Sequence, residues 1–132
     1  MQKSNFKDQN DKSKFKKEFT RRLVRFSVRI IKFSNKLKEK KFYWTIIDQL
    51  IRSSTSIGAN VVEAKSSSSK REYIRYFEIA LKSANETKYW LILVKEVSQE
   101  DSEEVNDLLN EVIKISKIIG SSILTLKGKK QF

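Results

Sequence analysis

Polar side chains of several chemical kinds recur at regular spacing near the middle of the sequence. Residues 49–63 read QLIRSSTSIGANVVE, in which Gln49, Arg52, Ser56, Asn60 and Glu63 follow one another at intervals of three or four residues. This spacing places all five on one stripe of an α-helix. Amide, guanidinium, hydroxyl and carboxylate groups could serve an active site or hold a ligand. Together with Glu86, Glu63 could also supply carboxylates to a metal ion.

The rest of the sequence argues against catalysis. It contains no histidine and no cysteine, which removes the commonest general base, the thiolate nucleophile and the usual ligands of transition metals. There is no glycine-rich phosphate loop, no nucleophile elbow and no Glu-x-x-His pair for a two-metal bundle. We therefore predict a protein that is not an enzyme and that uses no cofactor and no metal.

The polar stripe also has a structural interpretation. Ser56 and Asn60 are poor helix formers, so an interaction with another element must favour them. A polar stripe that is satisfied by a neighbouring helix fixes one register between the two. We expect Arg52 to pair with Glu63 or with Glu86, and Asn60 to bridge backbone groups. A plain solvent-exposed face remains the alternative.

Positive charge is concentrated at the start of the chain. The net charge is +12, and residues 1–41 hold 15 Lys and Arg against 4 Asp and Glu. Such asymmetry predicts an anionic partner, first of all nucleic acid. The residues expected to contact phosphates, called here the basic ridge, are Arg21, Arg22, Arg25, Arg29, Lys32 and Lys36. No acidic residue interrupts this face, although a simple solvated face remains the alternative interpretation.

The elements that carry these residues are expected to be helices. Proline is absent and glycine occurs only three times, which disfavours a sheet protein with tight turns. Apolar residues at intervals of three and four predict helices over 18–38, 43–65, 69–97 and 102–126. Short connections between such helices predict an all-α fold, an antiparallel up-down-up-down four-helix bundle. The bundle would occupy 18–127, preceded by a basic disordered arm (1–17) and followed by a short tail (128–132).

The first predicted helix has more apolar surface than one core requires. Beside the seam that ends at Leu37, a second apolar line contains Val24, Val28 and Ile31. A lone bundle would leave part of this surface exposed. No signal peptide and no run of ~18 apolar residues is visible, so we expect a cytoplasmic protein without a membrane partner.

Two stretches carry a family resemblance. QLIRSSTSIGANVVEA (49–64) and SKREYIRYFEIALKSANETKYWL (69–91) resemble the bacterial four-helix-bundle proteins encoded by intervening sequences in 23S ribosomal RNA genes. The chain departs from that pattern at Ala64 and Lys82, where the family has glycine, and at Gly58, where it often has proline. The matching positions are Gln49, Leu50, Arg52, Ser53, Ser56, Ile57, Ala59, Asn60, Glu63, Glu72, Tyr73, Tyr76, Phe77, Ile79, Ala80, Ser83 and Glu86.

The resemblance implies a ring-like homopentamer. The chain is also similar to the accessory protein of diversity-generating retroelements, a basic pentamer that binds RNA and a reverse transcriptase. Our leading hypothesis is a non-enzymatic oligomeric scaffold that binds nucleic acid, RNA rather than DNA, through the first helix and the N-terminal arm. The alternative is a protein-interaction adaptor for a nucleic-acid enzyme such as a reverse transcriptase.

Overall fold

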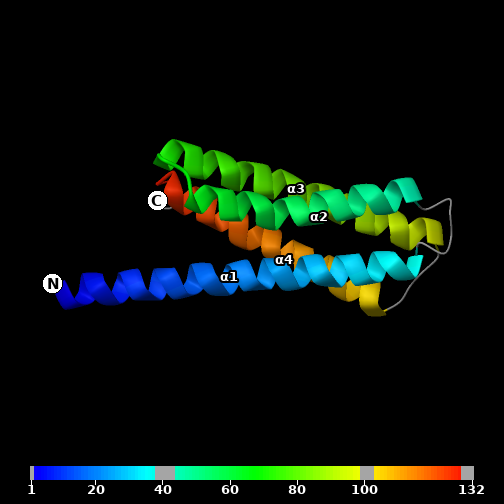
Figure 1. Cartoon of the computed structure of the whole chain (residues 1–132), viewed down its shortest axis with the longest axis horizontal. Helices are drawn as coiled ribbons and strands as arrows, with labels where there is room; N and C mark the ends of the chain where they lie inside the picture. The colour runs from blue at the N-terminus through cyan, green and yellow to red at the C-terminus, as the bar shows by residue number, and fades with distance from the viewer. Residues whose placement is uncertain (1, 38–43, 99–102, 129–132) are drawn as a thin grey trace.

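Four helices make up the described part of the protein, which comprises residues 2–37, 44–98 and 103–128 of a computed structural model. They are α1 (Gln2–Leu37), α2 (Trp44–Lys65), α3 (Lys70–Ser98) and α4 (Glu103–Leu126). Figure 1 shows them side by side, with the chain reversing its direction from each helix to the next. The predicted antiparallel four-helix bundle is therefore confirmed.

Local sequence signals explain where the helices begin and end. Ser69 caps α3, because its hydroxyl accepts a hydrogen bond from the amide of Glu72 at 3.1 Å. Beyond α4 the chain turns at Gly128, whose φ of 72° suits a residue without a Cβ. The tail beyond Gly128 and the predicted helix ends at Lys38, Tyr43 and Ser102 lie outside the described residues.

The start of α1 differs from the expectation. The structure has helix from Gln2 onward, where the sequence analysis expected a disordered arm before Glu18. Residues 2–17 contain no proline or glycine and are rich in lysine, a good helix former. Phe15 also stacks on Phe19 one turn later, with ring centroids 6.3 Å apart. The helix expected from Glu18 onward therefore continues without a break through residues 2–17.

The core lies along the bundle axis, and all four helices contribute to it. On α1 it uses the predicted seam, in which Phe26 and Ile30 are almost completely buried. Burial of each such side chain stabilises the fold by roughly 1.5–3 kcal/mol. The largest fully buried side chains are Phe26, Leu23, Ile30, Ile47, Leu50, Ile57, Leu91, Leu108, Ile115, Ile119, Val94 and Val105.

The second apolar line of α1 stays outside this core. Val24, Val28 and Ile31 are 57%, 43% and 39% exposed, respectively, as the width of the apolar surface predicted. Where the core face of α1 packs on α2, a Cβ added at Gly58 of α2 would lie 3.5 Å from the Cβ of Leu23, which is an ordinary van der Waals contact. Close packing of α1 on α2 therefore does not require glycine at this position.

None of the described helices combines the length and the apolar character needed to cross a membrane.

Candidate functional site

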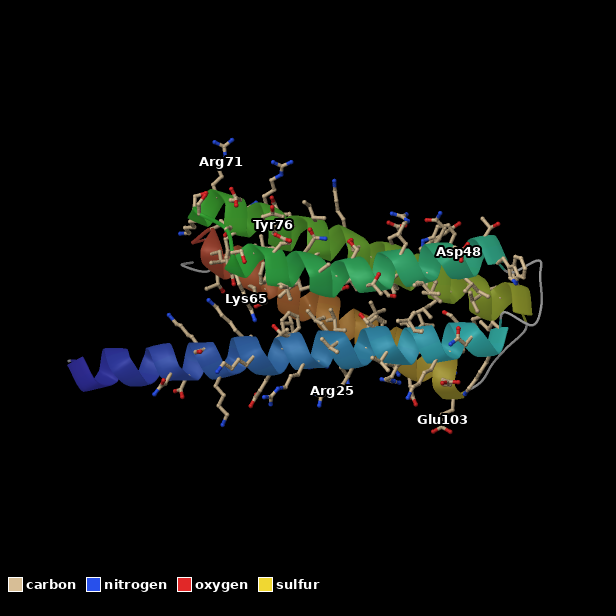
Figure 2. All side chains as sticks on the ribbon, viewed as in Figure 1. Arg25, Asp48, Lys65, Arg71, Tyr76 and Glu103 are labelled. Atoms are coloured by element: carbon tan, nitrogen blue, oxygen red, sulfur yellow. The ribbon has the colours of Figure 1, made fainter. Side chains whose placement is uncertain are left out.

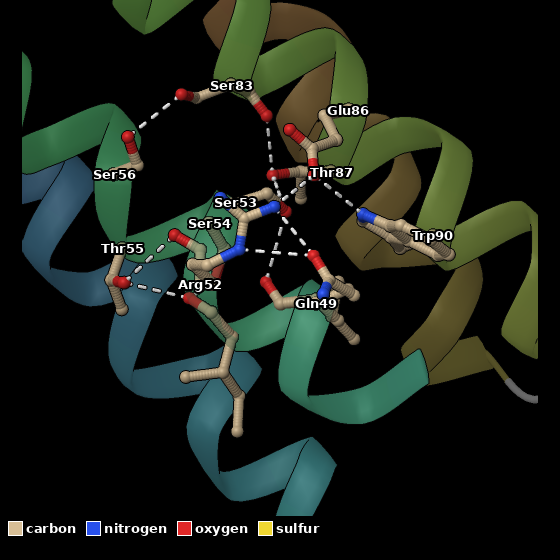
Figure 3. A network of polar contacts seen from close by, with 12 residues as sticks. Gln49, Arg52, Ser53, Ser54, Thr55, Ser56, Ser83, Glu86, Thr87 and Trp90 are labelled. Carbon is tan, nitrogen blue, oxygen red and sulfur yellow. Dashed lines mark hydrogen bonds and ion pairs between the residues drawn. The ribbon is translucent and has the colours of Figure 1, made fainter. Parts of the chain in front are cut away.

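The polar stripe of α2 meets α3 through the guanidinium of Arg52. Its Nε and Nη2 atoms donate to Oε1 of Gln49 at 3.1 and 2.6 Å, and Nη2 also donates to Oε2 of Glu86 at 2.9 Å. The indole of Trp90 donates to the same carboxylate oxygen at 3.1 Å, as Figure 3 shows. Of the two partners expected for Arg52, the structure therefore selects Glu86 on α3.

The remaining members of the stripe behave differently from one another. Ser56 of α2 shares a hydrogen bond with Ser83 of α3, the two hydroxyl oxygens lying 2.9 Å apart. Asn60 donates to the backbone oxygen and the hydroxyl of Ser56, at 2.9 and 3.0 Å, so it satisfies its own helix and not a neighbour. Glu63 is exposed, and its carboxylate takes part in no ion pair within the described ranges.

Two hydroxyl groups continue the network into the core. Ser53 and Thr87 are buried, and the Thr87 hydroxyl lies 2.9 Å from Oγ of Ser53 and 2.8 Å from the backbone oxygen of Ser83. Sequence reasoning missed Ser53 and Thr87 as partners, and it missed Trp90 as well. The signal of Ser53 and Thr87 was a hydroxyl side chain at a core position of the helical period, which by itself does not identify a contact across helices.

The network holds α2 and α3 together and has no evident catalytic chemistry. Apart from the exposed Glu63, these side chains bond to other groups of the protein, and the Arg52–Glu86, Ser56–Ser83 and Ser53–Thr87 contacts join α2 to α3. Polar contacts of this kind fix the register of two helices. Among the described residues no cluster of three potential metal ligands exists. Glu63 and Glu86 are also not brought together, because Glu86 binds Arg52, which precedes Glu63 by about three turns of α2.

The basic ridge of α1 divides into two groups, the first of which is bound to α4. Arg22 donates from Nε to Oε2 of Glu111 at 2.7 Å and from Nη2 to Oε1 at 2.9 Å. The two side chains are only 34% and 19% exposed. These hydrogen bonds are the main reason that the pKa of Glu111 lies below its ordinary value. Lys36 forms a single, more exposed ion pair with Glu104, in which Nζ lies 3.2 Å from Oε1.

The second group faces solvent. Arg21, Arg25, Arg29 and Lys32, called here the outer cations, are all exposed. None of them forms an ion pair with another described residue. Their spacing of four, four and three residues places them on one stripe, and Figure 2 shows Arg25 pointing away from the other helices. Positive charge is thus concentrated on the free side of α1.

The two groups could not be separated from sequence. No acid lies between Arg21 and Lys36 on α1, although Glu18 stands one turn before Arg22. The acidic partners found in the structure come from α4, more than sixty residues later. Arg29 occupies an intermediate position, because its charge helps to lower the pKa of Glu111 although the two form no ion pair.

Comparison with known proteins places this arrangement in a family. The family described as 23S rRNA-intervening sequence protein matches residues 16–121. A crystal structure of a protein of unknown function from the S23 ribosomal protein family of Bacteroides thetaiotaomicron VPI-5482 is similar, with 34% sequence identity and a TM-score of 0.75. The similarity covers 80% of this chain and 97% of that chain. No curated protein matches the sequence. The chain therefore belongs to the family of 23S rRNA-intervening sequence proteins.

Proposed function

We propose that the protein is a non-enzymatic scaffold that binds RNA through phosphate contacts from the outer cations of α1. The observation that carries the proposal is the contrast within the basic ridge. Arg22 is neutralised by Glu111, whereas Arg21, Arg25, Arg29 and Lys32 are exposed and have no acidic partner among the described residues. Four like charges on one stripe repel one another weakly, and an anionic polymer would remove that repulsion.

The geometry of the stripe suits a phosphate backbone. Successive outer cations are three or four residues apart, which corresponds to a rise of about 5–6 Å along the helix axis. Lys14 and Lys17 are also exposed and continue the positive surface toward the N-terminus. Phosphate contacts position a nucleic acid without reading its bases. We therefore expect binding that depends on shape and charge, with little preference for sequence.

Self-association is the second part of the proposal. Val24, Val28 and Ile31 form an exposed apolar line on α1, next to the outer cations. Apolar surface of this kind supports contact with another protein surface, and a second copy of the chain is the occupant we propose, within the homopentamer that the family resemblance implies. Several copies would present several cationic stripes to one RNA, so weak contacts would add up to a useful affinity.

One experiment tests both parts. The mass of the protein is measured by light scattering, alone and with a mixed pool of RNA, at a low and at a moderate salt concentration. We expect a mass of about five chains that increases with RNA only at low salt, because binding to phosphates releases counterions. A monomer whose mass does not change with RNA at either salt concentration would contradict the proposal. An oligomer that ignores RNA would favour the alternative, an adaptor for an enzyme such as a reverse transcriptase.

A further inference from the structure

A cleft opens at the end of the bundle where the N-terminal half of α1 passes the other three helices. It has a volume of about 890 Å³ and lies between α1, the end of α2, the start of α3 and the end of α4. Figure 1 shows α1 continuing past this end of the bundle, beside the turn that joins α2 to α3. The cleft is separate from the α2–α3 polar network and is not explained by the packing of the core.

Aromatic rings line two opposite walls of the cleft. Phe15 and Phe19 come from α1, and Tyr73 and Phe77 come from α3. Each pair is stacked, with ring centroids 6.3 Å apart on α1 and 5.0 Å apart on α3. Phe19 and Phe77 are buried, whereas Phe15 is 54% exposed. The exposed ring of Phe15 thus offers a flat apolar face to a flat ligand, and the partly buried Tyr73 lies on the other wall.

Positive charge surrounds these rings. The lining includes four lysines against Asp11 as its single acid, and all of the lining residues belong to the described chain. Nζ of one of these lysines, Lys16 of α1, lies 5.4 Å from the centroid of the Tyr73 ring on α3. Nζ of another, Lys65 of α2, donates to the hydroxyl of Thr20 on α1 at 2.7 Å. Both ammonium groups contact neutral partners, so an incoming phosphate could bind them without breaking an ion pair.

From this combination we propose that the cleft receives an unpaired nucleotide of a bound RNA strand. The base stacks against Phe15 and takes the place of the Lys16 ammonium over the Tyr73 ring, and a flanking phosphate contacts the displaced Lys16 and Lys65. Stacking on aromatic side chains accepts any base, because every base has a flat π-face. Base pairs of a duplex cannot enter, since their bases are already stacked inside the helix. The inference rests on the proposed function, because the strand is the one held by the outer cations.

The cleft and the outer cations lie on different sides of α1, because the cleft lies between α1 and the other helices whereas Arg25 points away from them. Lys17 follows Lys16 directly on α1, and the outer cations begin one turn further on, at Arg21. A strand held by the outer cations would therefore have to cross α1 beside Lys17, past the exposed carboxylate of Glu18, to reach the cleft. A purely apolar peptide would leave the lysines around the rings without an anionic partner, and a free inorganic anion would leave the rings without an apolar or stacking partner.

The first test compares paired ring substitutions in the full-length protein. Phe15→Leu and Tyr73→Leu keep apolar volume but remove the aromatic face, whereas Phe15→Tyr and Tyr73→Phe keep the face. Affinity is measured at low salt by fluorescence anisotropy, with a labelled oligouridine and with a labelled RNA duplex. We expect each leucine variant to bind the single strand at least about fivefold more weakly, with duplex affinity unchanged and the ring-preserving variants equal to wild type. Circular dichroism confirms that each variant is folded, which matters most for the partly buried Tyr73.

The second test locates the base. An oligouridine with 5-iodouridine at each position in turn is photo-crosslinked to the wild-type protein, and the adducts are mapped by mass spectrometry. Adducts at Phe15 or Tyr73 support the inference. Adducts found only elsewhere overturn it, and so do leucine variants that bind the single strand as tightly as wild type. In both of those cases the proposed function would still stand.

Two further outcomes separate the remaining possibilities. Uridine monophosphate that binds as tightly as the oligouridine would overturn the assignment to a strand, because the cleft would then be a site for free nucleotides. A wild-type protein that binds neither the single strand nor the duplex would overturn the proposed function, and the inference about the cleft would fall with it.

Discussion

Replacing the four outer cations by glutamine is the sharpest perturbation of the proposed interface. The variant Arg21→Gln, Arg25→Gln, Arg29→Gln, Lys32→Gln removes exposed side chains that form no ion pair among the described residues. The core and the Arg22–Glu111 contact between α1 and α4 remain intact. Glutamine is a good helix former, so we expect α1 to keep its structure.

The magnitude follows from counterion release. For a single-stranded nucleic acid each phosphate contact contributes about 0.7 to the slope of log affinity against log salt concentration, so four contacts contribute about 3 per protomer. A fourfold increase in salt should therefore weaken wild-type binding about 50-fold more than it weakens binding of the fourfold variant. Fluorescence anisotropy with a labelled single-stranded RNA, measured over a salt series for both proteins, gives the two slopes directly.

Arg22→Gln is the matched control, because it removes a charge of the same ridge that Glu111 already neutralises. We expect this variant to keep the wild-type salt slope, whereas Arg25→Gln should lower the slope. The reasoning is refuted if the fourfold variant and the wild type have equal slopes. It is refuted equally if Arg22→Gln lowers the slope as much as Arg25→Gln does, since the distinction between paired and free cations would then have no effect.

Three further predictions concern stability. Glu111→Gln should lower the free energy of unfolding at neutral pH by about 1 kcal/mol, because it breaks the ion pair with Arg22. Since the pKa of Glu111 is lowered in the folded protein, the pair contributes to stability above the ordinary pKa of 4.5, and this contribution is lost as the pH falls through the folded-state pKa. Urea unfolding should therefore show a difference in the free energy of unfolding between wild type and Glu111→Gln at neutral pH that disappears at acid pH. Gly58→Ala should raise the melting temperature, with a gain of up to ~1 kcal/mol, because alanine favours the helix and its Cβ meets an ordinary contact. Ser53→Ala should lower the free energy of unfolding by about 1 kcal/mol, because it removes the buried hydrogen bond with Thr87, as chemical denaturation would measure.

Contrary results would be informative in each case. A destabilisation of Glu111→Gln that persists at acid pH would assign the effect to packing and not to charge. A lower melting temperature for Gly58→Ala would mean that another surface approaches α2 at this point, which the monomer does not contain. A fully stable Ser53→Ala would show that the hydroxyl pair adds no net stability to the α2–α3 contact.

The helices and their buried faces could be predicted because their signals are local. Apolar residues three and four positions apart identify the seam of each helix, and the helix predicted from 69 onward begins where the Ser69 hydroxyl caps the amide of Glu72. The polar stripe was identified for the same reason, since one period of the helix aligns Gln49 with Arg52. The extent of α1 was underestimated, because residues 2–17 have too few apolar positions to show a period, although they favour helix.

The sequence by itself thus determined the helical fold, the antiparallel order and the two polar surfaces of interest. Only the tertiary structure decided which charges are free. Arg22 and Arg25 look equivalent along α1, yet within the described residues Arg22 pairs with a carboxylate, that of Glu111 on α4, and Arg25 pairs with none. Likewise, only the tertiary structure shows that Arg52 pairs with Glu86, and that Phe15 and Tyr73 line the same cleft. Each depends on residues that are far apart in the chain, and no periodicity within a single helix contains information about their distance in space.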